Sequence, residues 1–166
     1  MFRTFYPDTI KESAYDIDFL ALYQQGIRGV IFDIDNTLVE HGADANKRAK
    51  KLFENLQKLG MESCLLSNNK EERVARFNKE IGTNAIYKAG KPGRCGYEHA
   101  MELMGTDLAH TLFVGDQLFT DVWGAKRIGM ANILVRPIGK KEEIQIVLKR
   151  YLEKIVLFFY GREQKK

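Results

Sequence analysis

Four short polar segments of the chain combine residue types that together could handle a phosphate group. They are "DIDNT", which contains Asp33, Asp35 and Thr37, "SNN" from Ser67 to Asn69, "KP" beginning at Lys91, and "GDQLFTD", which contains Asp116 and Asp121. Carboxylates that gather at one place repel one another unless a cation offsets their charge. Several hard oxygen ligands suit Mg²⁺, which usually bridges a carboxylate and a phosphate. The residue types therefore predict a Mg²⁺ site for a phosphorylated substrate.

The spacing of Asp33 and Asp35 allows two different roles for the two acids. An ionised aspartate can attack phosphorus in line and form an aspartyl-phosphate, which divides hydrolysis into two easier steps. A second aspartate, two residues further on, can donate a proton to the leaving oxygen and later activate a water molecule. Lys91, the Ser67 hydroxyl and backbone amides could spread over the phosphoryl oxygens as negative charge develops there. The expected reaction is Mg²⁺-dependent hydrolysis of a phosphomonoester.

These residues can act together only if the fold brings them to one place. Strand-like runs, "VIFDI", "ESCLLS", "NAIYKA", "HTLFVGD" and "ANILV", alternate with helical patterns such as "ADANKRAKKLFENLQKLG". Strict alternation predicts an α/β fold, a Rossmann-like doubly wound parallel sheet with helices on both faces. Two terminal helices are expected over residues 16–25 and 140–160. Because such sheets bind ligands beyond the carboxyl ends of their strands, the polar segments are expected to converge on one rim.

Length and composition favour a single domain over residues 1–166, because 166 residues with 45% hydrophobic side chains can bury one core. Cys64 and Cys95 lie far apart without a CxxC motif, which argues against a zinc site and a disulfide framework and favours a reducing compartment. No signal peptide, transit sequence or membrane-spanning run is recognised, so a cytoplasmic protein is expected. The net charge of +4 suits an anionic substrate or surface.

Taken in this order, "DIDNT", Ser67, "KP" and "GDQLFTD" resemble the four-part signature of the haloacid dehalogenase (HAD) superfamily of phosphohydrolases, over roughly residues 28–135. The resemblance implies the HAD-like fold, Mg²⁺ as the cofactor and a role for each motif residue. Those roles are Asp33 as nucleophile and metal ligand, Asp35 as general acid and base with its backbone carbonyl on the metal, Thr37 as an orienting residue, Ser67 as a phosphoryl ligand, Lys91 as the charge that steadies nucleophile and phosphate, Asp116 as a metal ligand, and Asp121 as a supporting acid near the metal. Asn68, which follows the same strand as Ser67, and Thr37 are assigned with Ser67 to the substrate-binding residues.

More narrowly, "GIRGVIFDIDNTLV", "LSNN", "KP" and "VGDQLFTDVWGA" resemble the YqeG-like branch of small capless phosphatases, which is similar to the mitochondrial phosphatidylglycerophosphate phosphatases. Residues 37–61 and 67–91 hold too few elements for a cap domain. An uncapped rim encloses a small metabolite weakly but admits a phosphate that projects from a larger body. A large or surface-presented phosphomonoester is therefore expected, with a phospholipid head group such as phosphatidylglycerophosphate first. A phosphoprotein, a nucleic acid end or a sugar phosphate is the alternative.

The predicted last helix carries an apolar stripe whose partner the sequence leaves open. The stripe consists of Ile144, Val147, Leu148, Tyr151, Leu152, Ile155 and Phe159, while Leu157, Phe158 and Tyr160 interrupt the polar face. Basic residues surround this end of the chain, namely Lys149, Arg150, Lys154, Arg162, Lys165 and Lys166. Such a stripe usually packs on a core, but cations beside it also suit an anionic membrane. Core packing, a homo-oligomer and peripheral membrane contact are the three alternatives.

Each motif could also have a purely structural role, and two other functions are compatible with the whole set of residues. Asp-x-Asp alone is common in turns, Ser67 or Asn68 could cap the following helix, and Asp121 could do the same for "DVWGAK". A signalling receiver domain uses similar residues, but its lysine comes last in the chain, whereas Lys91 precedes Asp116. The other rival is a catalytically idle scaffold that binds phosphorylated partners, although every expected catalytic position is filled. No segment resembles a nucleic-acid module, so no nucleic acid partner is expected.

Overall fold

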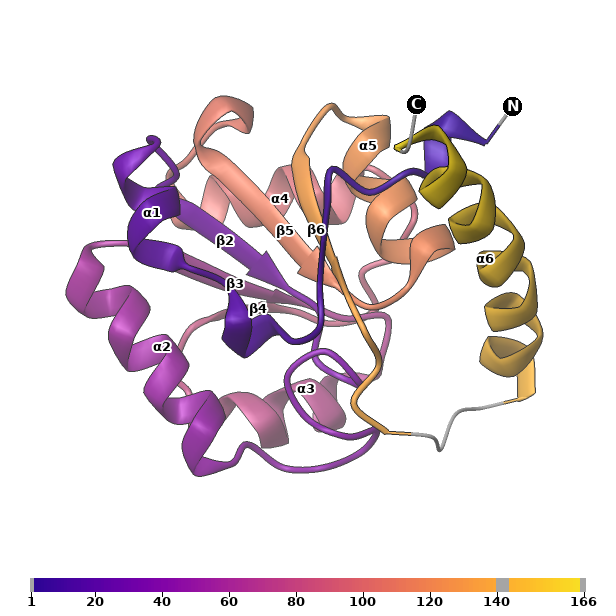
Figure 1. The fold of residues 1–166 in the computed structure, drawn as a ribbon. Coiled ribbons are helices and arrows are strands. Elements are labelled where there is room, and N and C mark those ends of the chain that lie inside the picture. Colours follow the sequence, from indigo (N-terminus) through magenta and orange to yellow (C-terminus); the bar gives the residue numbers. More distant parts are fainter. Residues whose placement is uncertain (1, 140–143, 165–166) are drawn as a thin grey trace.

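The chain folds around one parallel sheet of six strands in the order β1-β6-β5-β2-β3-β4 (Figure 1). The computed structural model describes residues 2–139 and 144–164. The strands are β1 (Thr9–Lys11), β2 (Gly29–Phe32), β3 (Glu62–Leu66), β4 (Asn84–Ile86), β5 (Thr111–Gly115) and β6 (Ala131–Val135). Every neighbouring pair is parallel. The predicted doubly wound α/β fold is thereby confirmed.

Helices cover both faces of the sheet because successive strand residues point to opposite sides. The helices are α1 (Phe19–Gln24), α2 (Lys47–Leu59), α3 (Glu71–Asn78), α4 (Cys95–Met104), α5 (Trp123–Arg127) and α6 (Ile144–Glu163). Phe32 of β2 packs in the core that α1, α2 and α3 share, whereas its neighbour Ile31 packs in the core that α4 and α5 share. The side chain of Asn46 caps α2, which ends at Gly60 with a positive φ of 79°. These two residues set the ends of α2.

The N-terminal region differs from the sequence prediction. The predicted helix over residues 16–25 is a 3₁₀ turn at Ala14–Asp16 followed, after a break, by the shorter helix α1. Strand β1 was not predicted. It pairs with β6 at the edge of the sheet, where Asp8 carboxylate oxygen Oδ2 accepts hydrogen bonds from the backbone N–H and the amide of Asn132 at 3.1 and 2.9 Å. Pairing with a distant strand, rather than local propensity, therefore fixes this segment.

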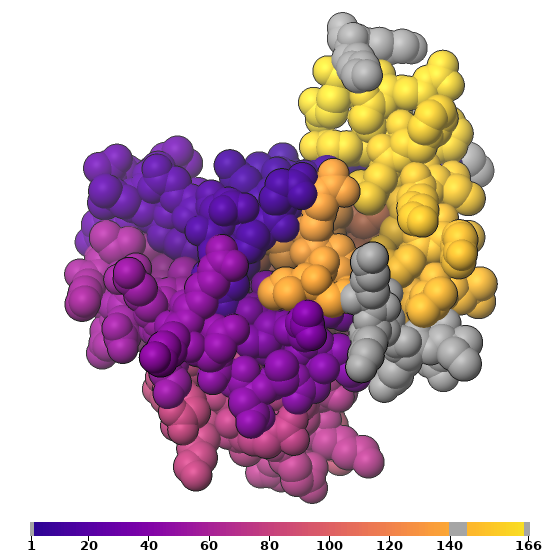
Figure 2. All heavy atoms as spheres, turned by 60° about the horizontal axis from the view of Figure 1, so that its bottom comes forward, coloured from indigo at the N-terminus to yellow at the C-terminus, as the bar shows by residue number. Residues whose placement is uncertain are grey.

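Helix α6 lies along the edge of the molecule next to the N-terminal residues, and its spheres form the yellow flank in Figure 2. Its buried side includes Val156, which packs with Leu118 and Leu134. Phe2 and Tyr6 contact Phe159 and Tyr160 through their rings, with centroids 5.5 and 5.2 Å apart. The helix ends at Glu163 rather than at residue 160. Its predicted start at Lys140, together with Lys165 and Lys166, lies outside the described residues.

The opposite side of α6 exposes an apolar surface, which we call the outer stripe. It consists of Val147, Leu148, Tyr151, Leu152, Ile155, Phe158 and Phe159, each exposed by between 41% and 68%. Much of the predicted apolar stripe therefore faces outward and does not pack on the core of the same chain, although Phe159 also contacts Phe2. Among the described helices, none has the length and apolar character needed to cross a membrane.

Candidate active site

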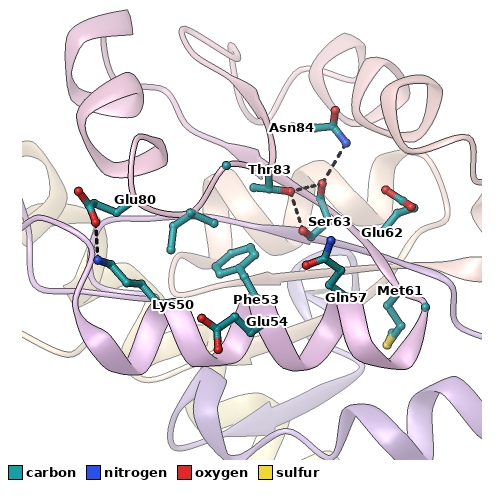
Figure 3. A pocket seen from close by; sticks show the side chains of 13 residues that line it. Lys50, Phe53, Glu54, Gln57, Met61, Glu62, Ser63, Glu80, Thr83 and Asn84 are labelled. Atoms are coloured by element: carbon teal, nitrogen blue, oxygen red, sulfur yellow. Dashed lines mark hydrogen bonds and ion pairs between the residues drawn. The ribbon is translucent and has the colours of Figure 1, made fainter.

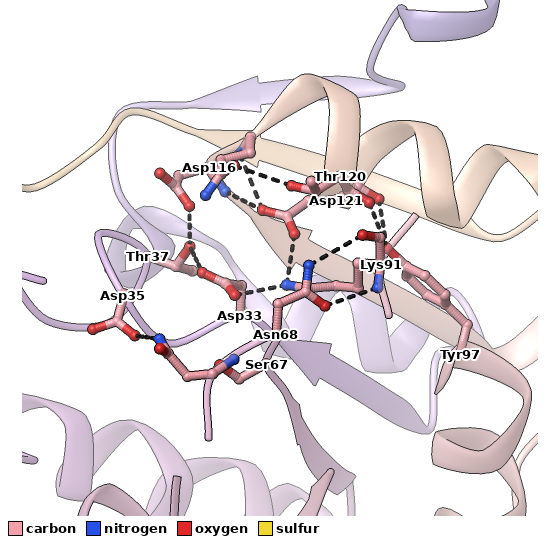
Figure 4. Close-up of polar contacts among 12 residues, drawn as sticks. Asp33, Asp35, Thr37, Ser67, Asn68, Lys91, Tyr97, Asp116, Thr120 and Asp121 are labelled. Atoms are coloured by element: carbon pink, nitrogen blue, oxygen red, sulfur yellow. Dashed lines mark hydrogen bonds and ion pairs between the residues drawn. The ribbon is translucent and has the colours of Figure 1, made fainter. Parts of the chain in front are cut away.

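The predicted site residues meet at the carboxyl edge of the sheet, as the alternating pattern indicated (Figure 4). Asp33 directly follows β2, Ser67 follows β3, Lys91 follows the short strand β4, and Asp116 follows β5. Four neighbouring strands thus deliver their polar residues to one rim. Asp33, Ser67, Lys91 and Asp116 are all buried. Burial of charged side chains is costly unless they pair, so the contacts among them define the site.

Lys91 bridges two of the acids. Its Nζ lies 2.7 Å from Oδ1 of Asp33 and 2.7 Å from Oδ1 of Asp121, and only 3% of its side chain is exposed. Burial alone would lower the pKa of Lys91, but the charges of Asp121 and Asp33 outweigh it and raise that pKa above its ordinary value. Asn68 holds the backbone of Lys91 at both ends, by accepting from its N–H at 2.8 Å and donating to its carbonyl at 3.1 Å. The ammonium group is therefore charged and fixed.

Asp121 is anchored to the end of β5. Its Oδ2 accepts the backbone N–H groups of Asp116 and Gln117 at 3.1 and 3.0 Å. The chain makes this possible with a turn of π-helix at Leu118–Val122 and with Gly115, where a Cβ would lie 2.5 Å from Oδ2. Asp121 therefore contacts both Lys91 and the backbone that follows β5, and its side chain does not merely cap the following helix.

Three buried carboxylates form a group that could hold a metal ion. One oxygen each from Asp33, Asp116 and Asp121 lies within 4.8 Å of the others. Burial raises the pKa of Asp33 to about 6. Burial, followed by the charges of Asp33 and Asp121, also raises the pKa of Asp116 well above its ordinary value. An all-oxygen set with this unfavourable concentration of negative charge fits a hard divalent cation such as Mg²⁺.

Thr37 links two members of this group. Its hydroxyl lies 3.2 Å from Oδ2 of Asp33 and 3.1 Å from Oδ1 of Asp116. A threonine hydroxyl has one proton to donate, so it can serve one carboxylate at a time. This contact agrees with the orienting role that the sequence suggested, although it does not place Thr37 on the substrate.

The carboxylate of Asp35 lies apart from the three-carboxylate group and points toward α3 (Figure 4). Its Oδ1 accepts hydrogen bonds from the backbone N–H of Gly42 at 2.7 Å and from the guanidinium of Arg73 at 2.9 Å, while Oδ2 accepts from the amide of Asn69 at 2.7 Å. Asp35 therefore offers no side-chain oxygen to the acid group in this arrangement. It does line the cavity next to Asp33.

A cavity of about 260 Å³ opens above Asp33 and Lys91. Its lining residues are Asp33, Asp35, Asn36, His41, Ser67, Asn68, Asn69, Lys91, Gln117, Thr120, Ile146 and Lys149. The helices and strands within residues 37–61 and 67–91 are α2, α3 and the short strand β4. However, Ile146 and Lys149 belong to α6, so the C-terminal helix lines one side of this cavity. The sequence had suggested that the rim of the site is open to solvent. Lys149 therefore borders the site.

Two charged residues at the site were not identified from the sequence. Arg73 binds Asp35, as described above. Arg150, which the sequence analysis named only among the basic residues around the C-terminal end, turns inward and pairs with the carboxylate of Asp116. Its Nη1 lies 3.0 Å from Oε2 of Glu153. The sequence does contain a sign of this second face of α6. Arg150 and Glu153 are three residues apart, so they lie together on the side of the helix opposite the outer stripe.

A second hollow, of about 440 Å³, lies at the opposite end of the sheet (Figure 3). It is bordered by α2 and by the residues that begin β3 and β4. Its polar groups bind one another: the Thr83 hydroxyl donates to the Ser63 carbonyl at 2.7 Å, and Lys50 pairs with Glu80. No group of candidate nucleophile, base and metal ligands converges among its described lining residues, so the catalytic candidate remains the carboxyl edge.

Comparison with known proteins supports the same assignment. Residues 88–147 match the family model described as HAD-hydrolase-like. The chain is 34% identical over 156 residues to the probable phosphatase YqeG of Bacillus subtilis (strain 168), across 93% of this chain and 91% of that protein. It is 28% identical over 173 residues to phosphatidylglycerophosphate phosphatase 1, chloroplastic/mitochondrial, of Arabidopsis thaliana, across 88% of this chain and 47% of that protein, so it spans about half the length of this relative.

Among solved structures, a HAD phosphatase from Thermococcus onnurineus superposes with a TM-score of 0.50 at 20% identity, across 60% of this chain and 50% of that chain. At this identity the likeness concerns the fold alone. It agrees with the parallel sheet and its flanking helices.

Proposed function

The chain belongs to the HAD superfamily of hydrolases and is a phosphatase of that family, and from this premise we propose that it hydrolyses a phosphomonoester with Mg²⁺ through an aspartyl-phosphate at Asp33. The observation that carries the proposal is the buried group of Asp33, Asp116 and Asp121, with Lys91 bound to two of them. A fixed lysine beside a buried carboxylate can neutralise an incoming phosphoryl group and keep the nucleophile in place.

The metal would be held by Asp33, Asp116 and the backbone carbonyl of Asp35, with Asp121 as the supporting acid. When bound, Mg²⁺ would supply positive charge to the phosphoryl oxygens and offset the repulsion among the carboxylates. The fit rests on the donor set, which consists of oxygens only, and on the carboxylate oxygens within 4.8 Å of one another.

In the first step, a carboxylate oxygen of Asp33 attacks phosphorus, and the bond between phosphorus and the leaving oxygen breaks. For this step Asp35 is protonated and its carboxyl turns from Arg73 toward Asp33. It then donates its proton to the leaving oxygen as the alcohol departs. In the second step, Asp35 removes a proton from water, the water oxygen attacks phosphorus, and the bond to Asp33 breaks, which releases phosphate. Lys91 stabilises the charge on the phosphoryl oxygens in both steps, and the Ser67 hydroxyl donates a further hydrogen bond to them.

Turnover of a chromogenic aryl phosphate by the purified chain tests this mechanism. We expect activity that disappears when a chelator removes Mg²⁺, is abolished in Asp33→Asn and is strongly reduced in Asp35→Asn. Asp44→Asn is the matched control, because Asp44 forms only an exposed ion pair with Arg76. Wild-type turnover by Asp33→Asn would exclude the covalent route through Asp33.

For the substrate we propose a large or surface-presented phosphomonoester, with phosphatidylglycerophosphate as the first candidate. Two observations support this choice: the similarity to a phosphatidylglycerophosphate phosphatase over 88% of the chain, and the outer stripe on the helix that walls the cavity. The test compares kcat/KM for this lipid in mixed micelles with that for soluble sugar and nucleotide phosphates. Much more efficient hydrolysis of the soluble esters would refute the lipid assignment.

We further propose that the outer stripe contacts an anionic membrane. Two cations stack on its aromatic rings, Lys154 over Tyr151 and Arg162 over Phe158, with charge-to-centroid distances of 5.3 and 5.7 Å. Apolar side chains beside such cations suit the interface between acyl chains and anionic head groups. Co-sedimentation with anionic liposomes should be lost in the double variant Leu148→Gln, Leu152→Gln. Unchanged co-sedimentation would exclude docking through this surface, and concentration-dependent dimerisation that the variant abolishes would assign the stripe to a second copy of the chain.

A further inference from the structure

Helix α6 reaches the acid group with the side opposite its outer stripe. Nη1 of Arg150 donates to the backbone carbonyl of Asp116 at 2.6 Å, and Nη2 pairs with Oδ2 of the same residue. Nη1 also lies 3.0 Å from Oε2 of Glu153. The guanidinium therefore holds Asp116 at two points, one on the backbone and one on the carboxylate. A planar guanidinium fixes direction as well as charge in such a contact.

Glu153 ties the same helix to the loop that follows β5. Its Oε1 accepts the backbone N–H of Leu118 at 2.8 Å, and its side chain is only 7% exposed. Leu118 begins the π-helical turn that carries Asp121. Arg150 and Glu153 together thus contact the segment that supplies two members of the acid group, although α6 lies outside the region covered by the HAD-like motifs.

The charges at Asp116 explain why such a contact matters. The Asp116 side chain is fully buried, and Asp33 and Asp121 lie beside it. Lys91 pairs with those two acids, whereas Asp116 pairs with Arg150; among the described residues no other cation contacts the Asp116 carboxylate. Without a partner a buried carboxylate is costly and its orientation is set only by Thr37.

We propose that Arg150, held in place by Glu153, is a positioning residue that orients Asp116 for the divalent cation, so that α6 forms part of the metal site. The inference rests on the proposed function, because it takes Asp116 as a metal ligand. Outer partners of metal ligands commonly set metal affinity without touching the ion. The opposite arrangement is that Arg150 occupies the place of the cation and competes with it.

Calorimetric titration of the full chain with MgCl₂, without substrate, separates these arrangements. We expect the Kd for Mg²⁺ to rise about 10- to 100-fold in Arg150→Ala. Arg150→Lys should give an intermediate Kd, because lysine supplies the charge but not the two-point contact. Arg136→Ala is the matched control with an unchanged Kd, since Arg136 forms an exposed ion pair with Glu12. Circular dichroism at the titration temperature verifies that each variant is folded.

If Arg150→Ala does not fold, Glu153→Gln supplies the test, because its amide oxygen can still accept the N–H of Leu118 while the ion pair with Arg150 is lost. A weaker Mg²⁺ affinity is expected there too. An unchanged Kd in the folded variants would overturn the inference, and a lower Kd would show competition instead. Equal weakening in Arg136→Ala would show that the effect is not specific to Arg150, and it would also overturn the inference. Failure of the wild-type chain to bind Mg²⁺ would overturn the proposed function itself, which the other outcomes leave intact.

Discussion

Substitution of Gly115 by alanine should displace Asp121, because the two residues are in direct contact at the end of β5. The added Cβ would lie 2.5 Å from Oδ2 of Asp121 and 2.7 Å from its Cβ. Real Cβ atoms do not approach other atoms so closely, and Asp121 is fully buried, so its carboxylate must shift. The shift acts on the hydrogen bonds from Asp116 and Gln117 and on the ion pair with Lys91.

The magnitude follows from these contacts. Each hydrogen bond to a charged group contributes about 1.5–3 kcal/mol. Weakening two of them, with partial relaxation of the loop, should lower the free energy of unfolding by about 3 kcal/mol. For a chain of 166 residues, each kcal/mol changes Tm by about 2–4 °C, so Tm should fall by about 6–12 °C. Turnover should fall by about 100-fold as Lys91 and the acid group lose their relative positions.

Scanning calorimetry and aryl phosphate turnover measure both effects. Gly161→Ala in α6 is the matched control, because a Cβ there meets no atom within 4 Å. Alanine in a helix interior should raise stability by about 0.5–1 kcal/mol. If Gly115→Ala melted at the wild-type temperature and kept wild-type turnover, the packing of Asp121 against β5 would not be a requirement of the site, and the reasoning would be wrong.

Three further predictions concern the same region. Burial raises the pKa of Asp33 from 3.8 to about 6, so the folded state binds this proton more tightly than the unfolded state. The stabilisation from that proton is full below about pH 4 and is lost as the pH rises through 6. Urea unfolding with chelator should therefore show a free energy of unfolding that decreases over this range, and an increase would contradict the prediction. Thr37→Val removes the donor shared by Asp33 and Asp116 and should weaken Mg²⁺ binding about tenfold by calorimetry, whereas equal affinity would count against the orienting role. Tyr97→Phe removes the hydroxyl that donates to the carbonyl of Thr120 at 2.9 Å. Denaturant unfolding should show a free energy of unfolding lower by about 1–3 kcal/mol. An unchanged free energy would mean that water replaces the hydroxyl as the donor.

Local patterns made the central strands and the composition of the site predictable. The run "GVIF" is buried throughout in β2, and the helical pattern "ADANKRAKKLFENLQKLG" forms α2, which Gly60 terminates. Because parallel strands carry their following residues to one rim, the order of Asp33, Ser67, Lys91 and Asp116 in the chain was enough to bring them together. The HAD resemblance added their roles, which the proposed experiments test.

Other features depend on contacts between distant segments, which periodicity does not specify. Strand β1 has three residues, "TIK", and is fixed by pairing with β6 and by the contact of Asp8 with Asn132, which is 124 residues away. Arg150 lies 34 residues from Asp116, and the sequence of α6 contains two candidate packing faces. Helical spacing identifies both faces but not which one meets the core, so the inward turn of Arg150 required the structure.

The most direct test of the account is chemical trapping of the phosphorylated residue during turnover. The purified chain is mixed with Mg²⁺ and substrate, quenched in acid within one turnover, and reduced with borohydride, which converts an aspartyl-phosphate to homoserine. Mass spectrometry of the peptide that contains Asp33 should detect homoserine at that position, and not in samples without substrate or in the inactive Asp33→Asn variant. Turnover with homoserine absent from position 33, or present at another aspartate, would contradict Asp33 as the nucleophile.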